Sequence, residues 1–369
     1  MSYIMAKKEI KGNTVAVDIG SKFIKIVRGN VSKTGNVTIT DVVIEPTPEA
    51  CMENGYIKSQ TDLGPYLNGL FGKNEMSKCN CTICGRSTDI IAREISVPAI
   101  KGPKLSKLIK NEIVTTFGNT ADYYTDYAIT ESVTEDYKSV YKILAYAAPK
   151  EVVNTYYDVL KTADVKPVKF DTHRNVISKL FTTPDLLINQ EPVSDKVMVF
   201  VDLGATYMDI DLIADGKSII KRAMSIAEDL DLSADMDSSF NSGNDSMYEL
   251  DDQASEYSSY GGYEGYSEDD DLSDYMYGSS ARSQISPILT KVNEELYKML
   301  QFATSRQGGK PVTNIYLYGG NSRINGLDQY LETTLGVKVE KICSLSNVDI
   351  SLDINLSDVL MAVGSLLRR

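Results

Sequence analysis

The sequence has no tryptophan, one histidine (His173) and five cysteines among its 369 residues. One histidine excludes a histidine-rich metal centre, and an odd number of cysteines without an export signal indicates free thiols. No apolar run approaches the roughly 20 residues that a membrane-spanning helix needs. The first ten residues contain no apolar stretch typical of a secretory signal, so we expect a cytoplasmic protein.

Basic residues are missing from a long internal segment. No Lys or Arg occurs from Ala223 to Ala281, whereas sixteen Asp and Glu lie between Glu228 and Asp274. The other 35 acids (51 − 16) face all 38 basic residues, so the rest of the chain carries about +3 (38 − 35). High like charge with few aliphatic residues predicts a disordered insertion at 228–283. Its tyrosines could bind a partner or be phosphorylated, or the segment is a tolerated surface insertion. Outside it, no clustered basic face of the kind that binds nucleic acid is present.

Three of the cysteines lie within six residues, at Cys79, Cys81 and Cys84. Thiolates this close together suit zinc, but a structural zinc site needs four ligands and His173 is far away in the sequence. The alternative is a strand in which Cys79, Cys81 and Ile83 share one face. We favour the strand.

Two segments half a chain apart share one pattern. Residues 15–27 (VAVDIGSKFIKIV) predict a strand, a tight turn and a second strand, and residues 196–213 (KVMVFVDLGATYMDIDLI) repeat it. The matching aspartates are 184 residues apart (202 − 18). This internal duplication predicts an α/β fold of two similar lobes.

Each turn contains the residue types that hold a phosphate group. A glycine lets backbone N–H groups approach phosphate oxygens, a hydroxyl adds a donor, and a carboxylate can hold hydrated magnesium. Paired turns in facing lobes therefore predict an ATP and Mg²⁺ site, although a duplicated fold without a ligand is the alternative. The predicted binding residues are Asp18, Gly20, Ser21 and Lys22 in the first turn and Asp202, Gly204, Ala205 and Thr206 in the second, with Asp18 and Asp202 as the metal ligands.

A third segment, NIYLYGGNSRINGLDQYL at 314–331, predicts a buried strand, a turn and a helix. Gly319 and Gly320 would let the chain lie flat against an adenosine. Asn321 and Ser322 would then stand at the start of the helix, where ligands are often bound.

Candidates for catalysis are fewer. Hydrolysis needs a residue that orients or deprotonates the attacking water, and Asp171 and Asp209 are the candidates. Asp171 could equally be the N-cap of the apolar helix that follows it. The single histidine, His173, is expected to be a partly exposed residue of that helix.

Between the two copies, the spacing of apolar residues changes over residues 88–168 and predicts the order β-α-β-β-α-β. This is the ferredoxin-like split pattern, and it indicates an inserted subdomain. The predicted organisation is a first lobe at 1–87, this subdomain at 88–168, a connecting helix region at 169–195, the second-lobe hairpin at 196–227, the acidic insertion at 228–283, the adenosine segment at 284–357 and a terminal helix at 358–369.

These segments together resemble the PilM family of type IV pilus assembly and, more distantly, the cell-division protein FtsA. The resemblance rests on VAVDIGSKFIKIV, TDIIAREISVPAIKGPKLSKLIKNEI, VFVDLGATYMDI, LYGGNSRINGLDQYL and the terminal DVLMAVGSLLRR. It implies an actin-like, two-lobed ATPase fold that binds ATP and Mg²⁺. It further implies a groove between the first lobe and the subdomain that holds the cytoplasmic tail of the inner-membrane protein PilN. The chain would then join a ring with other pilus platform components at the inner face of the membrane.

One feature departs from that family. Its members usually have a Gly-Gly turn after the third strand of the second lobe, whereas here Ile226-Ala227-Glu228 leads into the acidic insertion. Negative charge beside a triphosphate is unfavourable, so we expect ATP binding with slow or no hydrolysis.

Three alternatives stay open. A small-molecule kinase of the same superfamily would need a substrate-facing carboxylate, for which the sequence offers no convincing candidate. A polymerising cytoskeletal protein is the second. An FtsA-like protein fits less well, because no amphipathic membrane helix precedes Arg369.

Overall fold

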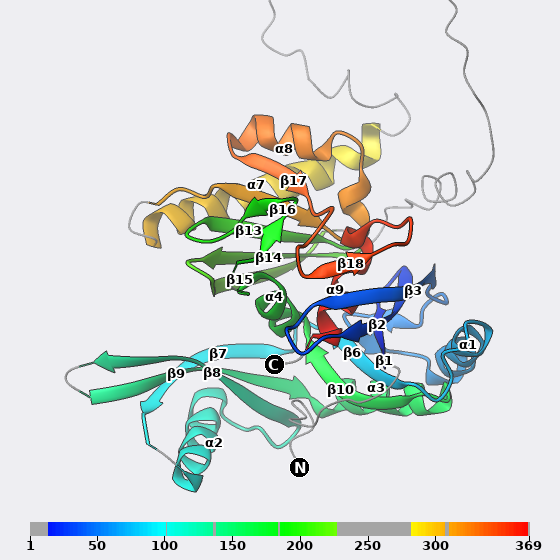
Figure 1. Ribbon diagram of the computed structural model, residues 1–369, viewed down its shortest axis with the longest axis horizontal. Coiled ribbons are helices and arrows are strands. Elements are labelled where there is room, and N and C mark those ends of the chain that lie inside the picture. The colour runs from blue at the N-terminus through cyan, green and yellow to red at the C-terminus, as the bar shows by residue number, and fades with distance from the viewer. Residues whose placement is uncertain are drawn as a thin grey trace, which may run out of the picture.

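The computed structural model describes residues 14–100, 102–135, 138–183, 185–226, 282–306 and 310–367. Two sheets lie one above the other with two helices between them, and a smaller sheet projects beside the first (Figure 1). The insertion predicted as disordered falls almost wholly at 227–281, outside the described residues.

The first lobe is built on a six-stranded sheet. Its strand order is β10-β6-β1-β2-β3-β18, in which β1, β2 and β3 form an antiparallel meander and β6 and β10 are parallel to β1. The last strand comes from near the end of the chain and pairs with β3. The bounds are β1 Thr14–Ile19, β2 Phe23–Val31, β3 Val37–Pro46, β6 Asn80–Gly85, β10 Lys166–Thr172 and β18 Val348–Ile350.

The second lobe repeats this arrangement in five strands ordered β15-β14-β13-β16-β17. Here β13, β14 and β15 form the antiparallel meander, while β16 and β17 continue the sheet in parallel. The same order in both sheets is the duplication that the two sequence copies predict. The bounds are β13 Val197–Leu203, β14 Tyr207–Ala214, β15 Lys217–Ser225, β16 Asn314–Tyr318 and β17 Lys338–Lys341.

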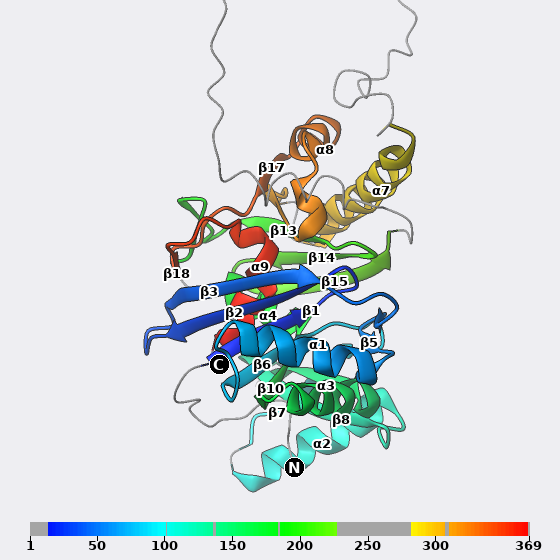
Figure 2. The same cartoon turned by 90° about the vertical axis from the view of Figure 1, so that its right-hand side faces the viewer.

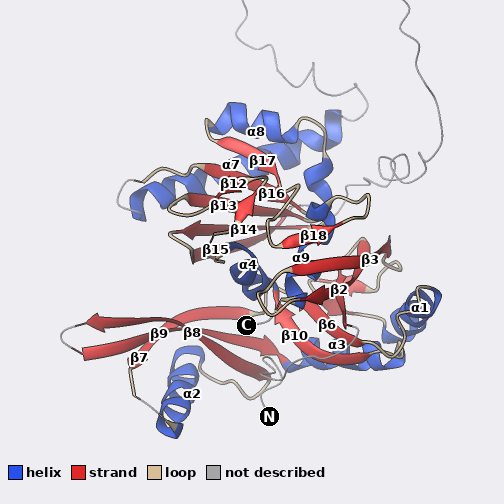
Figure 3. Cartoon of the chain, viewed as in Figure 1, coloured by secondary structure: helices blue, strands red, loops and turns tan. Residues whose placement is uncertain are grey.

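Helices cover both faces of each sheet (Figures 2 and 3). The outer face of the first sheet packs on α1 (Gln60–Lys73) and α3 (Lys150–Thr162), and that of the second packs on α7 (Arg282–Arg306) and α8 (Leu327–Leu335). Between the sheets lie α4 (His173–Phe181) and α9 (Leu356–Leu366), whose apolar side chains join those of both lobes in one core. A single core between the lobes ties them together.

The two central helices approach each other closely at a glycine. A Cβ on Gly364 of α9 would lie 2.6 Å from side-chain atoms of both Val176 and Leu180 of α4. Carbon atoms that are not bonded to each other pack at about 3.5–4.0 Å, so only a residue without a side chain fits here.

The inserted subdomain has the predicted element order, but its sheet is smaller than the ferredoxin-like pattern requires. Its three strands, in the order β7-β9-β8, pack on α2. The remaining two elements, α3 and β10, belong to the first lobe, because β10 pairs in parallel with β6. Lys166–Thr172 is thus the edge strand of the first-lobe sheet, next to β6. The bounds are β7 Ile91–Pro98, α2 Pro103–Phe117, β8 Tyr123–Glu135 and β9 Lys138–Pro149.

Four strands of two residues each complete the description. They form two small hairpins: β4 (Met52–Glu53) with β5 (Tyr56–Ile57), and β11 (Leu187–Ile188) with β12 (Glu191–Pro192). Among the residues described, no helix is both long and apolar enough to cross a membrane.

Candidate functional site

The β1–β2 and β13–β14 turns are closed by the same backbone hydrogen bond. The N–H of Gly20 donates to the carbonyl of Phe23 at 3.0 Å, and the N–H of Gly204 donates to the carbonyl of Tyr207 at 3.0 Å. A Cβ on Gly20 would lie 3.0 Å from that acceptor oxygen, and one on Gly204 would lie 2.9 Å from its own. A side chain at either position would therefore push its turn open.

The two turns meet at the boundary between the lobes. Oγ of Ser21 and Oγ1 of Thr206 are 3.1 Å apart, within hydrogen-bonding distance. The structure thus brings together the two hydroxyls predicted to hold phosphate, from residues 185 positions apart in the chain. A phosphate group held by both hydroxyls would have to replace this direct bond.

The third predicted segment packs on the second turn. Gly319 has a φ of +87°, and a Cβ there would lie 2.2 Å from Oδ1 of Asp202, so this contact requires glycine. Nδ2 of Asn321 donates to the carbonyl of Gly204 at 2.8 Å, and Oγ of Ser322 donates to the carbonyl of Gly319 at 2.7 Å. Both side chains are buried and hold the segment in place.

The helix expected directly after the Gly-Gly turn begins later. A short 3₁₀ turn over Gly320–Arg323 comes first, and α8 starts at Leu327. The chain changes direction between them at Gly326, which has a left-handed φ of +76°. Asn321 and Ser322 therefore belong to a buried turn and not to a helix N-terminus.

In the first hairpin the aspartate faces a lysine on the neighbouring strand. Asp18 pairs with Lys25, whose Nζ lies 3.3 Å from Oδ2 of Asp18. Burial lowers the pKa of Lys25, but Asp18 and Asp202 outweigh it and raise that pKa. The sequence prediction named Lys22, whose side chain is exposed. A lysine within an apolar strand, seven residues after the aspartate (25 − 18), was the signal for Lys25.

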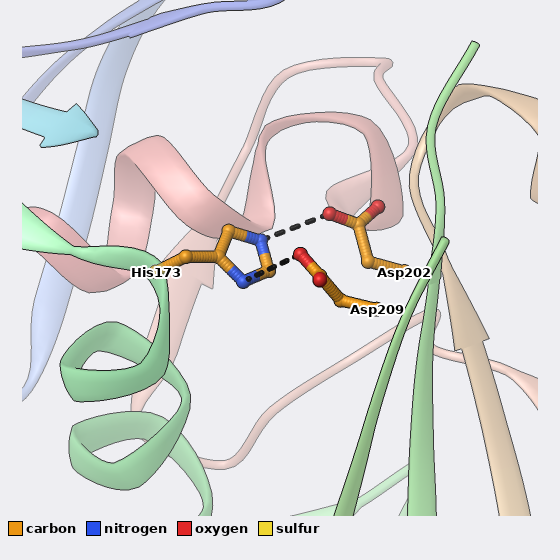
Figure 4. Close-up of side chains that lie close together, drawn as sticks. All are labelled: His173, Asp202 and Asp209. Atoms are coloured by element: carbon orange, nitrogen blue, oxygen red, sulfur yellow. Dashed lines mark hydrogen bonds and ion pairs between the residues drawn. The ribbon is translucent and has the colours of Figure 1, made fainter. Parts of the chain in front are cut away.

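In the second hairpin the corresponding position is another acid, because Asp202 pairs with Asp209. His173, the first residue of α4, lies between the two carboxylates (Figure 4). Its Nε2 is 2.9 Å from Oδ2 of Asp202, and its Nδ1 is 3.4 Å from Oδ2 of Asp209. The expectation of a partly exposed histidine was wrong: His173 is 5% exposed, because α4 packs its first turn between the lobes.

Two cations reach Asp209. Nε of Arg86, which follows β6 in the first lobe, lies 2.6 Å from Oδ2 of Asp209, and Nζ of Lys221 lies 3.3 Å from it. The Arg86 guanidinium also stacks on the ring of Tyr207 at 4.5 Å. Burial raises the pKa of Asp209, but Lys221 and Arg86 outweigh it and hold that pKa well below its usual range. A carboxylate so strongly held in its ionised form is a poor proton acceptor.

Asp171 lies in a second buried ion-pair group. Burial raises its pKa, but Lys179 and Lys169 outweigh it and lower the pKa to about 2. Nζ of Lys169 is 3.0 Å away, Lys179 also pairs with it, and Nδ2 of Asn175 donates to it at 2.6 Å. The N-cap of α4 is Thr172, whose hydroxyl accepts the N–H of Asn175. The N-cap prediction was therefore wrong by one residue.

The cysteines behave as residues of a buried strand. Cys79, Cys81 and Ile83 pack in the outer core of the first lobe, and Cys84 faces the core between the lobes. All three thiols of this run are free, and burial raises the pKa of Cys81. The described residues contain one group of three potential metal ligands, and it is His173, Asp202 and Asp209.

The paired hairpins, the shared core and the third segment define the class. This chain has the actin-like ATPase fold, with the residues predicted to bind nucleotide gathered where its lobes meet. It belongs to the family described as type IV pilus assembly protein PilM, whose model matches residues 16–230. That match covers all of the inserted subdomain and the second hairpin, and it ends where the acidic segment begins.

Solved structures agree on the fold. A PilM–PilN type IV pilus biogenesis complex is similar with a TM-score of 0.70 and 18% identity, over 96% of this chain and 97% of the other. The ethanolamine utilization protein EutJ from Carboxydothermus hydrogenoformans (TM-score 0.45, 12% identity, 99% and 92% covered) and MreB5 of Spiroplasma citri bound to ADP (0.41, 11%, 96% and 95%) are more distant. No curated protein matches the sequence.

Proposed function

We propose that this protein binds ATP where its two lobes meet, as part of a scaffold for type IV pilus assembly. The observation that carries the nucleotide proposal is the direct contact of the two turns at Ser21 and Thr206. Backbone N–H groups and hydroxyls of the two turns would hold the phosphates. A Cβ on Gly320 would meet nothing within 4 Å, so there is open space at this residue that the adenosine would occupy.

The carboxylates at the boundary fit a magnesium ion. Oδ2 of Asp18 forms an ion pair with Lys25, and Oδ2 of Asp202 accepts a hydrogen bond from His173, which leaves Oδ1 of each for a metal. Carboxylate oxygens are the ligands that Mg²⁺ prefers, usually one or two of them alongside water and phosphate. Bound there, Mg²⁺ would neutralise charge on the triphosphate.

The same contacts argue for slow or absent hydrolysis. Asp209 and Asp171, the two predicted catalytic residues, are both ionised and held by cations. Neither is free to take a proton from water, so we propose that both stabilise the fold instead. In addition, Ile226, the last described residue before the acidic segment, lies next to the second turn, since its N–H donates to the carbonyl of Thr206 at 3.0 Å.

The partner is proposed from the family and from the similarity to the PilM–PilN complex. A PilN-like inner-membrane protein would place its cytoplasmic tail between the first lobe and the inserted subdomain, which would keep this protein at the inner face of the membrane. The subdomain is tied to both lobes, because the Tyr124 hydroxyl donates to Asn154 at 2.9 Å and Lys217 pairs with Glu131 at 2.7 Å. These contacts support a position of the subdomain beside the first lobe. Assembly into a ring with other platform components is part of the same proposal.

Nucleotide binding is tested by calorimetry of the purified protein with ATP and ADP, each with Mg²⁺ and with EDTA. We expect micromolar or tighter binding that is weakened by EDTA, and ATP turnover of no more than a few per minute. Absence of binding in every condition would refute the nucleotide proposal, and faster steady turnover would refute the scaffold with slow hydrolysis. Light scattering on addition of ATP separates a scaffold from a polymerising protein.

The partner is tested with a peptide copying the cytoplasmic N-terminus of the PilN-like protein encoded in the same genome. We expect saturable binding at one site per chain, and a scrambled peptide of the same composition serves as the control. Equal binding of both peptides would contradict a specific groove.

A further inference from the structure

The aspartates of the two turns, Asp18 and Asp202, are held by different kinds of group. Asp18 is paired with the ammonium of Lys25, a permanent cation on its own hairpin. Asp202 is instead 2.9 Å from an imidazole nitrogen of His173, which lies on α4 and belongs to neither hairpin. The second carboxylate is thus oriented from outside its own hairpin.

The proton on His173 can be located from its neighbours. Nζ of Lys221 is 2.9 Å from Nδ1 of His173, closer than the Asp209 oxygen at 3.4 Å. An ammonium only donates, so Nδ1 accepts from Lys221 and the ring proton lies on Nε2. Nε2–H then donates to Oδ2 of Asp202. This N–H donor orients the carboxylate of Asp202, whereas the ammonium of Lys25 offsets the charge of Asp18.

Asp202 is also confined on its other side. Its Oδ1 occupies the space that a Cβ of Gly319 would need. The carboxylate is therefore set by His173 at one oxygen and by the third segment at the other. Because His173 is only 5% exposed and stacks beside the ring of Tyr318, its own position is fixed as well.

We infer that His173 is a positioning residue for the metal bound with the nucleotide: held by Lys221, it orients Asp202 so that this carboxylate, more than Asp18, binds the divalent cation. The inference rests on the proposed nucleotide function and adds to it the residue that governs its metal dependence. Hydrogen-bond partners of metal ligands typically contribute 10- to 100-fold to metal affinity.

The test measures how ADP binding depends on free Mn²⁺, used as a spectroscopic probe for Mg²⁺. In His173→Ala we expect the Mn²⁺ concentration for half-maximal effect to rise by about 10- to 100-fold. If the histidine acts only through Asp202, which its Nε2 contacts, ADP affinity in EDTA should stay within about twofold of the native value. His173→Gln, whose amide N–H can reach the place of Nε2–H, should recover most of the loss. Lys310→Ala, which removes an exposed lysine of the same lobe, should match the native protein.

The outcomes are distinguishable. If the native protein binds no nucleotide with or without metal, both the proposed function and this inference fail. If it binds ADP and Mn²⁺ but His173→Ala shows the native metal dependence, only the inference fails. Equal impairment of His173→Ala and His173→Gln, or equal losses with Mn²⁺ and in EDTA, would show that the histidine acts through packing alone and would also overturn it. Thermal unfolding of the metal-free variants confirms that they are folded.

Discussion

The two hairpins have the same backbone arrangement, but the residue opposite the aspartate carries a positive charge in the first and a negative charge in the second. Asp18 faces Lys25, and 184 residues later Asp202 faces Asp209 (209 − 25 = 184). The first pair neutralises itself within one hairpin. The second places two acids opposite each other, which is destabilising unless cations come from elsewhere. They come from β15 and from the first lobe.

Because of this difference, the second hairpin is contacted by charged and polar groups from the other lobe and from the helix between the lobes. Lys221 belongs to the same sheet as Asp209, but Arg86 belongs to the other lobe and His173 to the helix between the lobes. Because these groups are buried, their attraction is weakly screened by water. The ion pair between Asp209 and Arg86 thus connects the two lobes at the place where the nucleotide is proposed to bind.

The largest effect is expected from removing the cation that crosses the lobes. Arg86→Met leaves the buried Asp209 short of a partner, so we expect a loss of about 3 kcal/mol in the free energy of unfolding, measured in urea. The double variant with Asp209→Asn no longer has an unpaired charge and should regain part of that loss. If Arg86→Met unfolds like the native protein, the second hairpin does not depend on the first lobe.

The first hairpin is tested by Lys25→Met. The ammonium offsets negative charge on both aspartates that are proposed to bind the metal. Without it that charge would repel the triphosphate, so we expect about tenfold weaker ATP binding, and a stability loss of about 1–2 kcal/mol because a charged hydrogen bond is removed. Lys22→Met is the matched control, since Lys22 is exposed, and it should change ATP affinity by less than twofold. A larger effect from Lys22→Met would favour Lys22, the lysine named from the sequence, as the residue that binds the nucleotide.

The pH dependence of stability separates Asp209 from an ordinary surface acid. Its pKa is depressed in the folded protein, so its ionised form stabilises the fold above the unfolded value of 3.8, and this contribution is lost as pH falls below that value. In urea unfolding between pH 5 and 3, Asp209→Asn should therefore be less stable than the native protein at pH 5 and lose less stability toward pH 3. Parallel curves for the two proteins would contradict the ion-pair assignment.

The smallest effect concerns the acidic segment, which begins beside the second turn and far along the chain from the first. Glu228 is two residues beyond Ile226, so chain length alone keeps it within about 7 Å of that residue. Replacing Glu228, Asp229 and Asp231 by their amides should tighten ATP binding about threefold at low salt and have no effect near 0.5 M salt. The control neutralises three acids of the same segment further along, Asp269, Asp270 and Asp271. Equal effects from both sets would indicate a general charge effect.

Local patterns gave most of the fold. Alternating apolar residues, the Asp-x-Gly turns and the helix at the chain end all lie in the structure near their predicted places, and the fold class and family are confirmed. The wrong predictions concern which strands pair and which side chains contact one another. The sequence order β-α-β-β-α-β was right, but nothing in residues 166–172 shows that this strand pairs with β6 and leaves the subdomain. Asp171 and His173 were placed at the correct helix boundary, but the N-cap is Thr172 and His173 is buried.

By itself, the sequence determined that two similar lobes exist, where their turns lie and which glycines and hydroxyls those turns contain. These features depend on periodicity and turn chemistry, which act over a few residues. Only the tertiary structure decided that Lys25 pairs with Asp18, that His173 contacts Asp202 and that Arg86 crosses to Asp209. Those contacts join residues from 7 to 123 positions apart, and their strength comes from burial that no local pattern records.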